Sequence, residues 1–382
     1  MQRVGTALIG CGKIAAVHAQ ALSGLPESHF VAVCDADPAR SQEFAQHYGV
    51  RAYSNVMEML HAPDVQMVSI CTPHPTHAKL AVAAAQARVH MLIEKPMAAS
   101  LRDCDLAIAA AQEARVKLGV VSQRRFYEPV QRVKCAIEEE RIGKPVMANL
   151  IVMGWRDEAY YRLDAWRGKW ETEGGGVLVN QTPHQLDLLQ WFMGPIQELF
   201  GYWDNLNHPY IEVEDTAIAV LRFQSGALGT IQVSNSQKPG FGAKIHIHGQ
   251  NGASVGVQTD GGSSFIAGVT EEVEPPINDV WSVPGEEHLL AQWKTEDRAR
   301  AQTLDVIFHY HELQIQDFLR AIIEGREPAV NGREGRRHVE IFTAIYRSQR
   351  DRRPVMFPLD AERGSELFDG RLSRRYQQAF AS

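Results

Sequence analysis

Residues 4–15 have the sequence VGTALIGCGKIA, which is a short apolar run, two glycines and the start of an Ala-rich segment. This spacing matches the G-x-G-x-x-G/A pattern of a strand, a turn and a helix. Gly10 permits the tight turn, Gly12 lets the backbone approach a pyrophosphate, and the small Ala15 lets the helix pack on the strand. Glycines are common in such turns, so the pattern gains its weight from the segments that follow it.

The first 125 or so residues alternate between two hydrophobic periods. We expect strands at 4–9, 30–34, 66–71, 90–93 and 116–121. Helices are expected between them at 14–25, 39–48, 78–87 and 101–114. Strands that alternate with helices of this length pair in parallel through right-handed crossovers. The sequence therefore predicts an α/β fold class with a doubly wound parallel (Rossmann) sheet over residues 1–125.

After Phe126 the pattern changes to strands in near succession. We expect helices at 129–140, 181–192, 309–324 and 333–347, and strands at 147–152, 199–203, 217–223, 228–233, 244–248 and 253–257. Short turns between neighbouring strands indicate a largely antiparallel sheet. These elements predict an α+β domain over 126–350, with an extended insertion at 261–304 and a tail at 351–382 that we do not place.

Composition narrows the class of protein. The chain has 382 residues, enough for two domains, and its net charge of -7 argues against a nucleic-acid surface. No apolar run approaches the roughly 18 residues of a membrane helix, and no secretory signal is recognisable at the N-terminus. The five cysteines are scattered without a pairing pattern, which favours a reducing compartment. We expect a cytoplasmic protein that binds neither nucleic acid nor membrane.

The glycine turn and the end of the second expected strand predict a dinucleotide. Lys13 and Ile14 open the first helix, where exposed amides favour the pyrophosphate. Asp35 ends the second strand, where an acid hydrogen-bonds the adenosine ribose and repels a 2′-phosphate. Asp37 is the better helix N-cap, which leaves Asp35 for the ribose. We therefore expect NAD, with NADP as the alternative because Arg40 could host a 2′-phosphate.

Residues 71–77, CTPHPTH, follow the strand expected at 66–71 and lie at the carboxyl edge of the sheet, where ligands bind in such folds. We expect Thr72, Pro73 and His74 to border the cofactor. For His77, contact with the cofactor competes with support of the following helix, and spacing favours support.

Glu94 and Lys95 follow the strand expected at 90–93 at the same edge, so we expect both to border the cofactor. A partly desolvated lysine there can polarise a carbonyl or orient a hydroxyl. The alternative is an ordinary solvated lysine.

A second glycine run, 174–176, precedes a helix that carries polar side chains on one face. Asn180, His184 and Asp187 stand at positions i, i+4 and i+7, and His184 is a proton carrier at neutral pH. Asp187 either orients His184 or pairs with chain nearby. The alternative for His184 is a buried histidine that ties the helix to a loop.

The loop before this run is rich in aromatic and basic residues. Tyr161, Trp166 and Arg167 suit a sugar, because aromatic faces stack on C–H surfaces and guanidinium groups bind hydroxyls or carboxylates. The alternative is a packed loop whose aromatics are core. Arg124 could hold substrate, cofactor or the domain junction. No set of His, Cys, Asp and Glu has zinc spacing, so we expect no metal.

Five motifs together resemble the glucose–fructose oxidoreductase/inositol dehydrogenase (Gfo/Idh/MocA) family. They are GCGKIA at 10–15, CTPHPTHA at 71–78, EKP at 94–96, QRRF at 123–126 and GGGVLVNQTPHQLD at 174–187. A fainter likeness extends to about residue 350. The resemblance implies an open second sheet that forms a homodimer or homotetramer. It also implies that Lys95 and His184 line the site beside the nicotinamide, with Gln123 at the cofactor.

One position departs from the family pattern. Many members have an aspartate four residues before the histidine, whereas this chain has Asn180, which cannot titrate. Asn180 could still hydrogen-bond substrate or hold His184. The resemblance implies an NAD-dependent oxidoreductase that moves a hydride to or from a hydroxyl-bearing carbon of a sugar, sugar derivative or cyclitol. The alternatives are an NAD-using glycosidase of the same family and a dinucleotide-binding regulator without catalysis.

Overall fold

The computed structural model describes the chain except for residues 1–2, 239, 241, 261–274 and 363–382. The chain divides into two compact units: unit 1 is Met1–Gln123 with Asp305–Arg336, and unit 2 is Arg124–Leu304 with Arg337–Ser382. The predicted N-terminal boundary at 125 lies two residues away. The prediction that all of 126–350 forms one domain differs from this division, because helix α10 (Val306–Glu324) packs its apolar side into unit 1.

Unit 1 contains a parallel sheet with the strand order β3-β2-β1-β4-β5-β6. Its strands are β1 (Val4–Ile9), β2 (Ser28–Cys34), β3 (Arg51–Tyr53), β4 (Met67–Ile70), β5 (His90–Ile93) and β6 (Leu118–Val120). The order reverses between β1 and β4, and ligands of such sheets bind beyond the carboxyl ends of the strands at this point. The doubly wound fold predicted from the alternation is confirmed.

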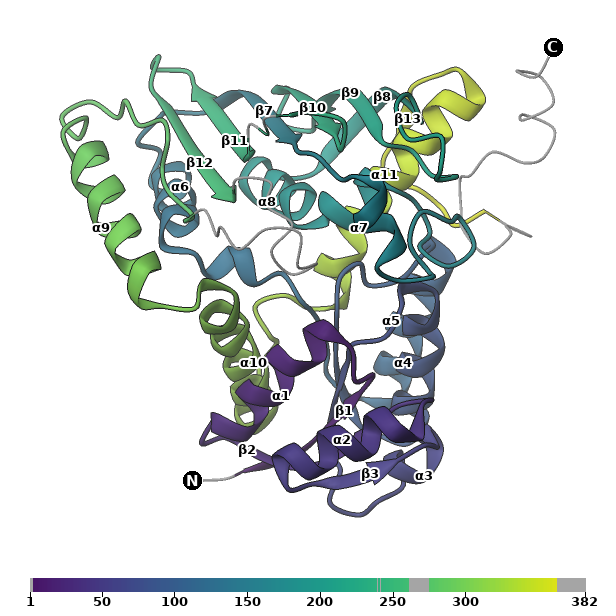
Figure 1. The fold of residues 1–382 in the computed structure, drawn as a ribbon. Helices are drawn as coiled ribbons and strands as arrows, with labels where there is room; N and C mark the ends of the chain where they lie inside the picture. Colours follow the sequence, from purple (N-terminus) through teal and green to yellow (C-terminus); the bar gives the residue numbers. More distant parts are fainter. Residues whose placement is uncertain (1–2, 239, 241, 261–274, 363–382) are drawn as a thin grey trace, which may run out of the picture. The chain divides into compact units, whose positions relative to one another are not determined.

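Apart from the short α3, the helices of unit 1 match the predicted ones within about three residues. They are α1 (Lys13–Gly24), α2 (Pro38–Tyr48), α3 (Val56–Leu60), α4 (His77–Gln86), α5 (Leu101–Ala114) and α10. Leu22 of α1 and Phe318 of α10 are buried in one cluster with Val4 of β1, so the two helices cover one face of the sheet (Figure 1). The sequence patterns did not predict β3 and α3, which are too short to show a period.

Unit 2 contains a mixed sheet with the order β12-β11-β7-β10-β9-β8-β13. Its strands are β7 (Pro145–Met153), β8 (Ile196–Asp204), β9 (Thr216–Phe223), β10 (Leu228–Ser234), β11 (Gly242–Gly249), β12 (Ser254–Asp260) and β13 (Val355–Met356). Neighbouring strands are antiparallel except for the parallel pair β7 and β10. Along β9 buried and exposed residues alternate, as expected when one face packs on helices.

Helices lie against one face of this sheet (Figure 1). Unit 2 contains α6 (Glu128–Glu138), α7 (Glu158–Arg162), α8 (Pro183–Met193), α9 (Leu289–Thr303) and α11 (Gly332–Asp351), which begins in unit 1. Helix α9 corrects the expectation of an extended segment up to residue 304; its weak amphipathic pattern hid it. The part of that segment at 261–274 lies outside the described residues. The tail from residue 351, which the sequence did not place, contains β13 near its start, and β13 pairs with β8 at the edge of the sheet.

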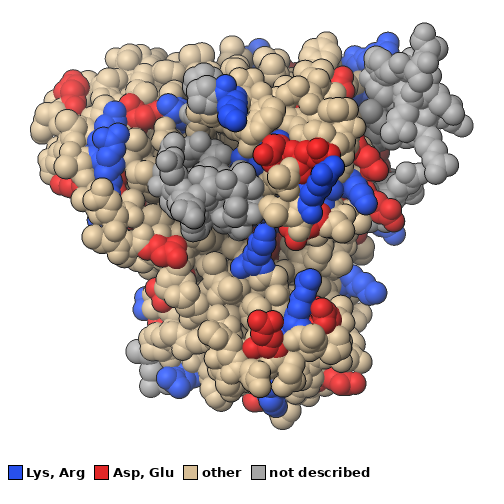
Figure 2. All heavy atoms as spheres, viewed as in Figure 1, with Lys and Arg blue, Asp and Glu red and all other residues tan. Residues whose placement is uncertain are grey.

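Within the described ranges, no helix combines the length and apolar character that crossing a bilayer requires. On the face drawn in Figure 2, the side chains of both charge signs are interspersed rather than gathered into one basic region.

Candidate active site

The glycine turn after β1 leaves room for a phosphate. Gly10 has a φ of 91°, and a Cβ there would lie 2.7 Å from the carbonyl oxygen of Cys71, so the turn requires glycine. Gly12 is the N-cap of α1, and a Cβ on it would meet nothing within 4 Å. No side chain caps this helix start. The first amide groups of α1 therefore have no side-chain cap, and such a helix start is where an anion binds readily.

Asp35 lies beside this turn and Asp37 caps the next helix. The Asp35 carboxylate accepts hydrogen bonds from the backbone N–H of Cys11 (2.7 Å) and of Asp37 (2.8 Å). Asp37 accepts from the N–H of Ala39, which confirms it as the N-cap of α2. Arg40 lies 3.5 Å from Asp37, with both side chains more than half exposed. The Asp35 carboxylate is therefore fixed at the end of β2, where a ribose hydroxyl can reach it.

The loop after β4 is supported from behind by His77. This ring is completely buried and contacts two carbonyl oxygens, Nδ1 to that of Pro96 (2.9 Å) and Nε2 to that of Thr72 (2.7 Å). Burial lowers the pKa of His77. Two roles were considered for His77, contact with the cofactor and support of the neighbouring chain. The structure favours support and corrects the assignment to the cofactor, because a fully enclosed ring cannot touch a ligand. Thr72, Pro73 and the mostly buried His74 remain at the edge of the loop.

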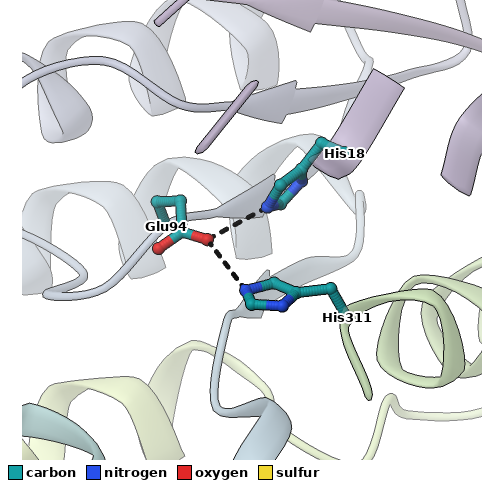
Figure 3. A group of neighbouring side chains, drawn as sticks. All are labelled: His18, Glu94 and His311. Carbon is teal, nitrogen blue, oxygen red and sulfur yellow. Dashed lines mark hydrogen bonds and ion pairs between the residues drawn. The ribbon is translucent and has the colours of Figure 1, made fainter. Parts of the chain in front are cut away.

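Glu94 fixes the backbone at Lys95 and belongs to a buried group from three segments. One carboxylate oxygen accepts from the Lys95 N–H (3.1 Å), and the other lies 3.0 Å from Nε2 of His18 on α1 and 3.7 Å from Nε2 of His311 on α10 (Figure 3). Glu94 is 6 % exposed, so it acts from inside the unit, whereas Lys95 is partly exposed. Glu94 thus braces the backbone at Lys95, and its contact with the cofactor stays a prediction.

The ligand atoms of these three side chains lie within 4.8 Å of one another, an arrangement that could hold a metal ion. No spacing in the sequence could reveal it, since its members are far apart along the chain. Hydrogen bonds to other residues explain how the two rings are held without a metal. His18 Nδ1 contacts Ser69 Oγ at 2.6 Å, and His311 Nδ1 donates to the Ile307 carbonyl at 2.6 Å. We interpret it as a buried ion pair between His18 and Glu94 with His311 beside it.

Gln123 closes the first segment of unit 1, and Arg124 opens unit 2. Gln123 is buried, and among the described residues its Oε1 has no hydrogen-bond partner. A bound carboxamide N–H₂ would satisfy that oxygen, and this fits a nicotinamide. Arg124 donates to Thr259 Oγ1 at 3.2 Å, which gives it a structural partner within unit 2.

The second glycine run is required by close packing around Glu214. A Cβ on Gly176 would lie 1.8 Å from the carbonyl oxygen of Glu214. The Glu214 carboxylate accepts from the N–H of Gly176 (2.9 Å) and Leu178 (3.1 Å) and from the hydroxyl of Tyr346 (2.9 Å). The run leads into a π-helical turn, Val177–Gln181, and then into α8. Glu214 thereby sets the start of the segment that carries Asn180 and His184.

Asn180, His184 and Asp187 have different surroundings. Asn180 is partly exposed, and its side-chain Nδ2 donates to Glu173 and to the Tyr160 hydroxyl (3.3 Å). His184, the second residue of α8, is 6 % exposed. Asp187 forms a two-pronged ion pair with Arg125, at 2.7 and 2.5 Å. Of the two roles considered for Asp187, the structure shows the pairing with chain nearby.

The aromatic loop contains both core and partly exposed residues. Tyr161 belongs to a buried cluster with Tyr160, Ile211 and Val213, so the core alternative holds for it and we no longer assign it to substrate. Trp166 and Arg167 are partly exposed and stacked, with the guanidinium 4.5 Å from the indole centroid. These two residues keep surface that a sugar could contact.

Sequence reasoning missed several polar residues that build this region. His208 and Asp215 form a completely buried pair at 2.7 Å, and His208 also contacts the carbonyl of Arg156. Glu173 lies directly before the glycine run. Its position in the sequence was the one signal that could have indicated a buried acid. The glycines that follow it pack closely against other backbone, so a side chain next to them is easily buried.

The geometry first defines a class: unit 1 is a Rossmann domain with a glycine turn open to a dinucleotide, and unit 2 is an α/β domain with a buried polar cluster. The chain belongs to the Gfo/Idh/MocA oxidoreductase family. The family's "NAD-binding Rossmann fold" domain matches residues 4–122, and its "C-terminal alpha/beta domain" matches residues 134–357. The resemblance drawn from the five motifs is confirmed.

Several relatives with similar sequence are named dehydrogenases. Myo-inositol 2-dehydrogenase of Thermotoga maritima is 29% identical over 358 residues, which cover 92% of this chain and 98% of the relative. The scyllo-inositol 2-dehydrogenase (NAD(+)) of Bacillus subtilis is 25% identical, with coverage of 94% and 98%. The solved WlbA dehydrogenase from Bordetella pertussis, in complex with NADH and UDP-GlcNAcA, is 31% identical with a TM-score of 0.82 and covers 94% of this chain and 99% of that one.

Proposed function

We propose that the protein is an NAD-dependent dehydrogenase that acts on a CH–OH group of a sugar, sugar derivative or cyclitol. The observation that carries this proposal is the match to both family domains, together with a relative of 31% identity that was solved with NADH and UDP-GlcNAcA. The inositol dehydrogenases support a polyhydroxylated ring as the substrate.

The cofactor residues we propose follow from the geometry of unit 1. The amides at the start of α1 bind the pyrophosphate beside Gly10 and Gly12, and Asp35 accepts from the adenosine ribose. Thr72, Pro73 and His74 border the bound dinucleotide. Gln123 accepts from the carboxamide. We propose NAD over NADP because a carboxylate held at the position of Asp35 repels a 2′-phosphate.

We assign each chemical role to named residues of this chain. When bound, a nicotinamide supplies the hydride acceptor for oxidation and the donor for the reverse. His184 takes the hydroxyl proton as the C–H bond breaks, and returns it in reduction. Lys95, held by Glu94, stabilises the negative charge that develops on the substrate oxygen. Asn180 hydrogen-bonds a substrate hydroxyl, and Trp166, Arg167 and Arg124 contact the rest of the ring.

A direct assay tests this function. The purified chain is incubated with NAD or NADP and a panel of cyclitols, free sugars and nucleotide sugars, and reduced nicotinamide is followed by absorbance. We expect turnover with at least one polyhydroxylated ring and a clear preference for NAD. Cleavage of a glycoside without net NADH formation would identify the glycosidase alternative instead. Tight NADH binding without turnover of any compound would identify the regulator.

A further inference from the structure

Glu173 is a completely enclosed carboxylate that the proposed mechanism does not use. It is 1 % exposed and lies between the aromatic loop and the glycine run. Its Oε2 accepts from the Gly168 N–H at 2.5 Å, and its Oε1 accepts from the side-chain Nδ2 of Asn180. Burying a carboxylate is costly unless donors surround it. Its presence here calls for a function.

The contacts of Asn180 define which way its amide is turned. A primary amide has two N–H donors on one side and a carbonyl acceptor on the other. Both contacts of Nδ2, to Glu173 and to the Tyr160 hydroxyl, lie on the donor side. The carbonyl Oδ1 therefore lies on the opposite side of the amide, on a residue that is partly exposed. Without an acceptor-only group at Glu173, the amide could turn over and present a donor instead.

We propose that Glu173 is a positioning residue that locks Asn180 with its carbonyl oxygen toward the substrate, so that Asn180 accepts a hydrogen bond from one substrate hydroxyl. This inference rests on the proposed function and adds a specificity determinant to it. Asn180 then offers the same kind of acceptor that an aspartate would offer at this position, without carrying a charge. The negative charge lies instead on Glu173, the buried residue that accepts from Asn180.

Burial and the surrounding donors together place the titration of the Glu173 carboxyl near neutral pH. Burial raises the pKa of Glu173 to about 7, against the Gly168 N–H, the guanidinium of Arg167 and the Asn180 amide, which lower it. Among the described residues, other ionisable groups that interact with Glu173 or its neighbours include Glu214, Arg156, Tyr160, Tyr161 and Asp164, which pairs with Arg167. Above neutral pH the carboxylate accepts from Asn180. When protonated it can donate, and the lock loosens.

A reciprocal exchange tests the lock. In Glu173→Gln, one carbonyl must serve two donors, Gly168 N–H and Asn180 Nδ2, so one of them faces an N–H₂ group. In Asn180→Asp, two carboxylates meet. In the double variant, the new amide can accept from Gly168 N–H through its carbonyl and donate through its N–H₂ to the new carboxylate, which again presents an oxygen outward. We expect each single change to lower kcat/KM by about tenfold to a hundredfold, and the double variant to recover most of the loss.

Two further readouts separate positioning from a general structural defect. A set of monodeoxy analogues should show that the wild type discriminates against loss of one particular hydroxyl, and Glu173→Gln should abolish that discrimination. The side-chain N–H₂ signals of Asn180, assigned by their loss in Asn180→Asp, should shift with pH around neutrality in the wild type and not in Glu173→Gln. The control is Glu171→Gln, an exposed acid two residues away, which should leave every readout unchanged.

The outcomes distinguish the two proposals. Losses that simply add in the double variant, or Asn180 signals that ignore the Glu173 change, would overturn the lock. If no polyhydroxylated substrate is turned over but the Asn180 signals still follow Glu173, the proposed function fails while the contact stands. Discrimination against one monodeoxy analogue in the wild type that disappears in Glu173→Gln, with NADH affinity unchanged, would support both.

Discussion

His184 is the single side chain on which the proposed proton transfer depends. It is the second residue of α8, directly after Pro183, and is largely enclosed. The segment before it is held by Glu214, a carboxylate whose pKa is raised to about 7 by burial. A histidine placed on such a rigid turn has little freedom, which suits a group that must meet one hydroxyl.

We expect His184→Ala to lower kcat by about a hundredfold or more, because general acid–base catalysis contributes on this order. The affinity for NADH, measured by fluorescence titration, should change little, since the cofactor residues we propose belong to unit 1. His288→Ala is the matched control, as His288 is exposed in the same unit. Turnover like that of the wild type would remove His184 from catalysis.

Among the elements of unit 1, the buried pair of His18 and Glu94 joins α1 to the end of β5, with α10 behind it. Burial opposes the charge on both groups. The neighbouring Cys71 and Glu94 side chains nevertheless raise the pKa of His18 to about 10, and the contact with His18 lowers the pKa of Glu94 to about 2. Burial lowers the pKa of His311 to about 4, so it stays neutral.

These directions predict how stability changes with pH. The stability that the raised pKa of His18 contributes is fully present below the ordinary value of 6.5 and is lost as pH rises through about 10. The stability that the lowered pKa of Glu94 contributes is present above 4.5 and is lost as pH falls toward 2. The stability difference between the wild type and Glu94→Gln should therefore be largest between about pH 4.5 and 6.5. It should shrink toward pH 10, by at most about 1.4 kcal/mol per pH unit.

Denaturant unfolding at several pH values measures this difference. Exposed Glu43→Gln on α2 is the control, for which we expect no pH-dependent difference. A difference that stays constant from about pH 6 to 10 would show that His18 is not protonated by this pair.

For the molecule as a whole, one face of the second sheet carries several exposed apolar side chains beside the Glu198–Arg222 ion pair. Tyr202 on β8 pairs with Ile218 on β9, and Val220 and Leu228 lie on the same face further along the ladders. Their exposed fractions range from 50% to 66%. An apolar surface that continues across neighbouring strands marks an interaction site. We propose that a second copy of the chain covers this face in a homodimer or homotetramer.

Val220→Lys places a charge at the centre of this face and should shift the protein toward monomer in light scattering coupled to size exclusion. Leu106→Lys on α5, an equally exposed apolar residue of unit 1, should leave the assembly unchanged. A wild type that is already monomeric at micromolar concentration would contradict the proposed interface.

Local patterns along the chain were sufficient to predict the parallel sheet of unit 1 except for β3, and the place of each motif, but they did not assign α10 to this unit. Alternating hydrophobic periods and turn residues act over a few positions, so they predicted the parallel sheet, the glycine turn and the Asp37 cap. They also marked the second glycine run, although only the folded chain shows why Gly176 must lack a side chain.

Contacts between segments that are far apart in the sequence determined which side chains are buried and support their neighbours. They assigned His77, Tyr161 and Glu94 to supporting roles. They brought His18 and His311 to Glu94, and they placed Glu173 behind Asn180. Burial and hydrogen-bond partners set the charge of an ionisable group and the orientation of an amide, and no local pattern encodes either of them.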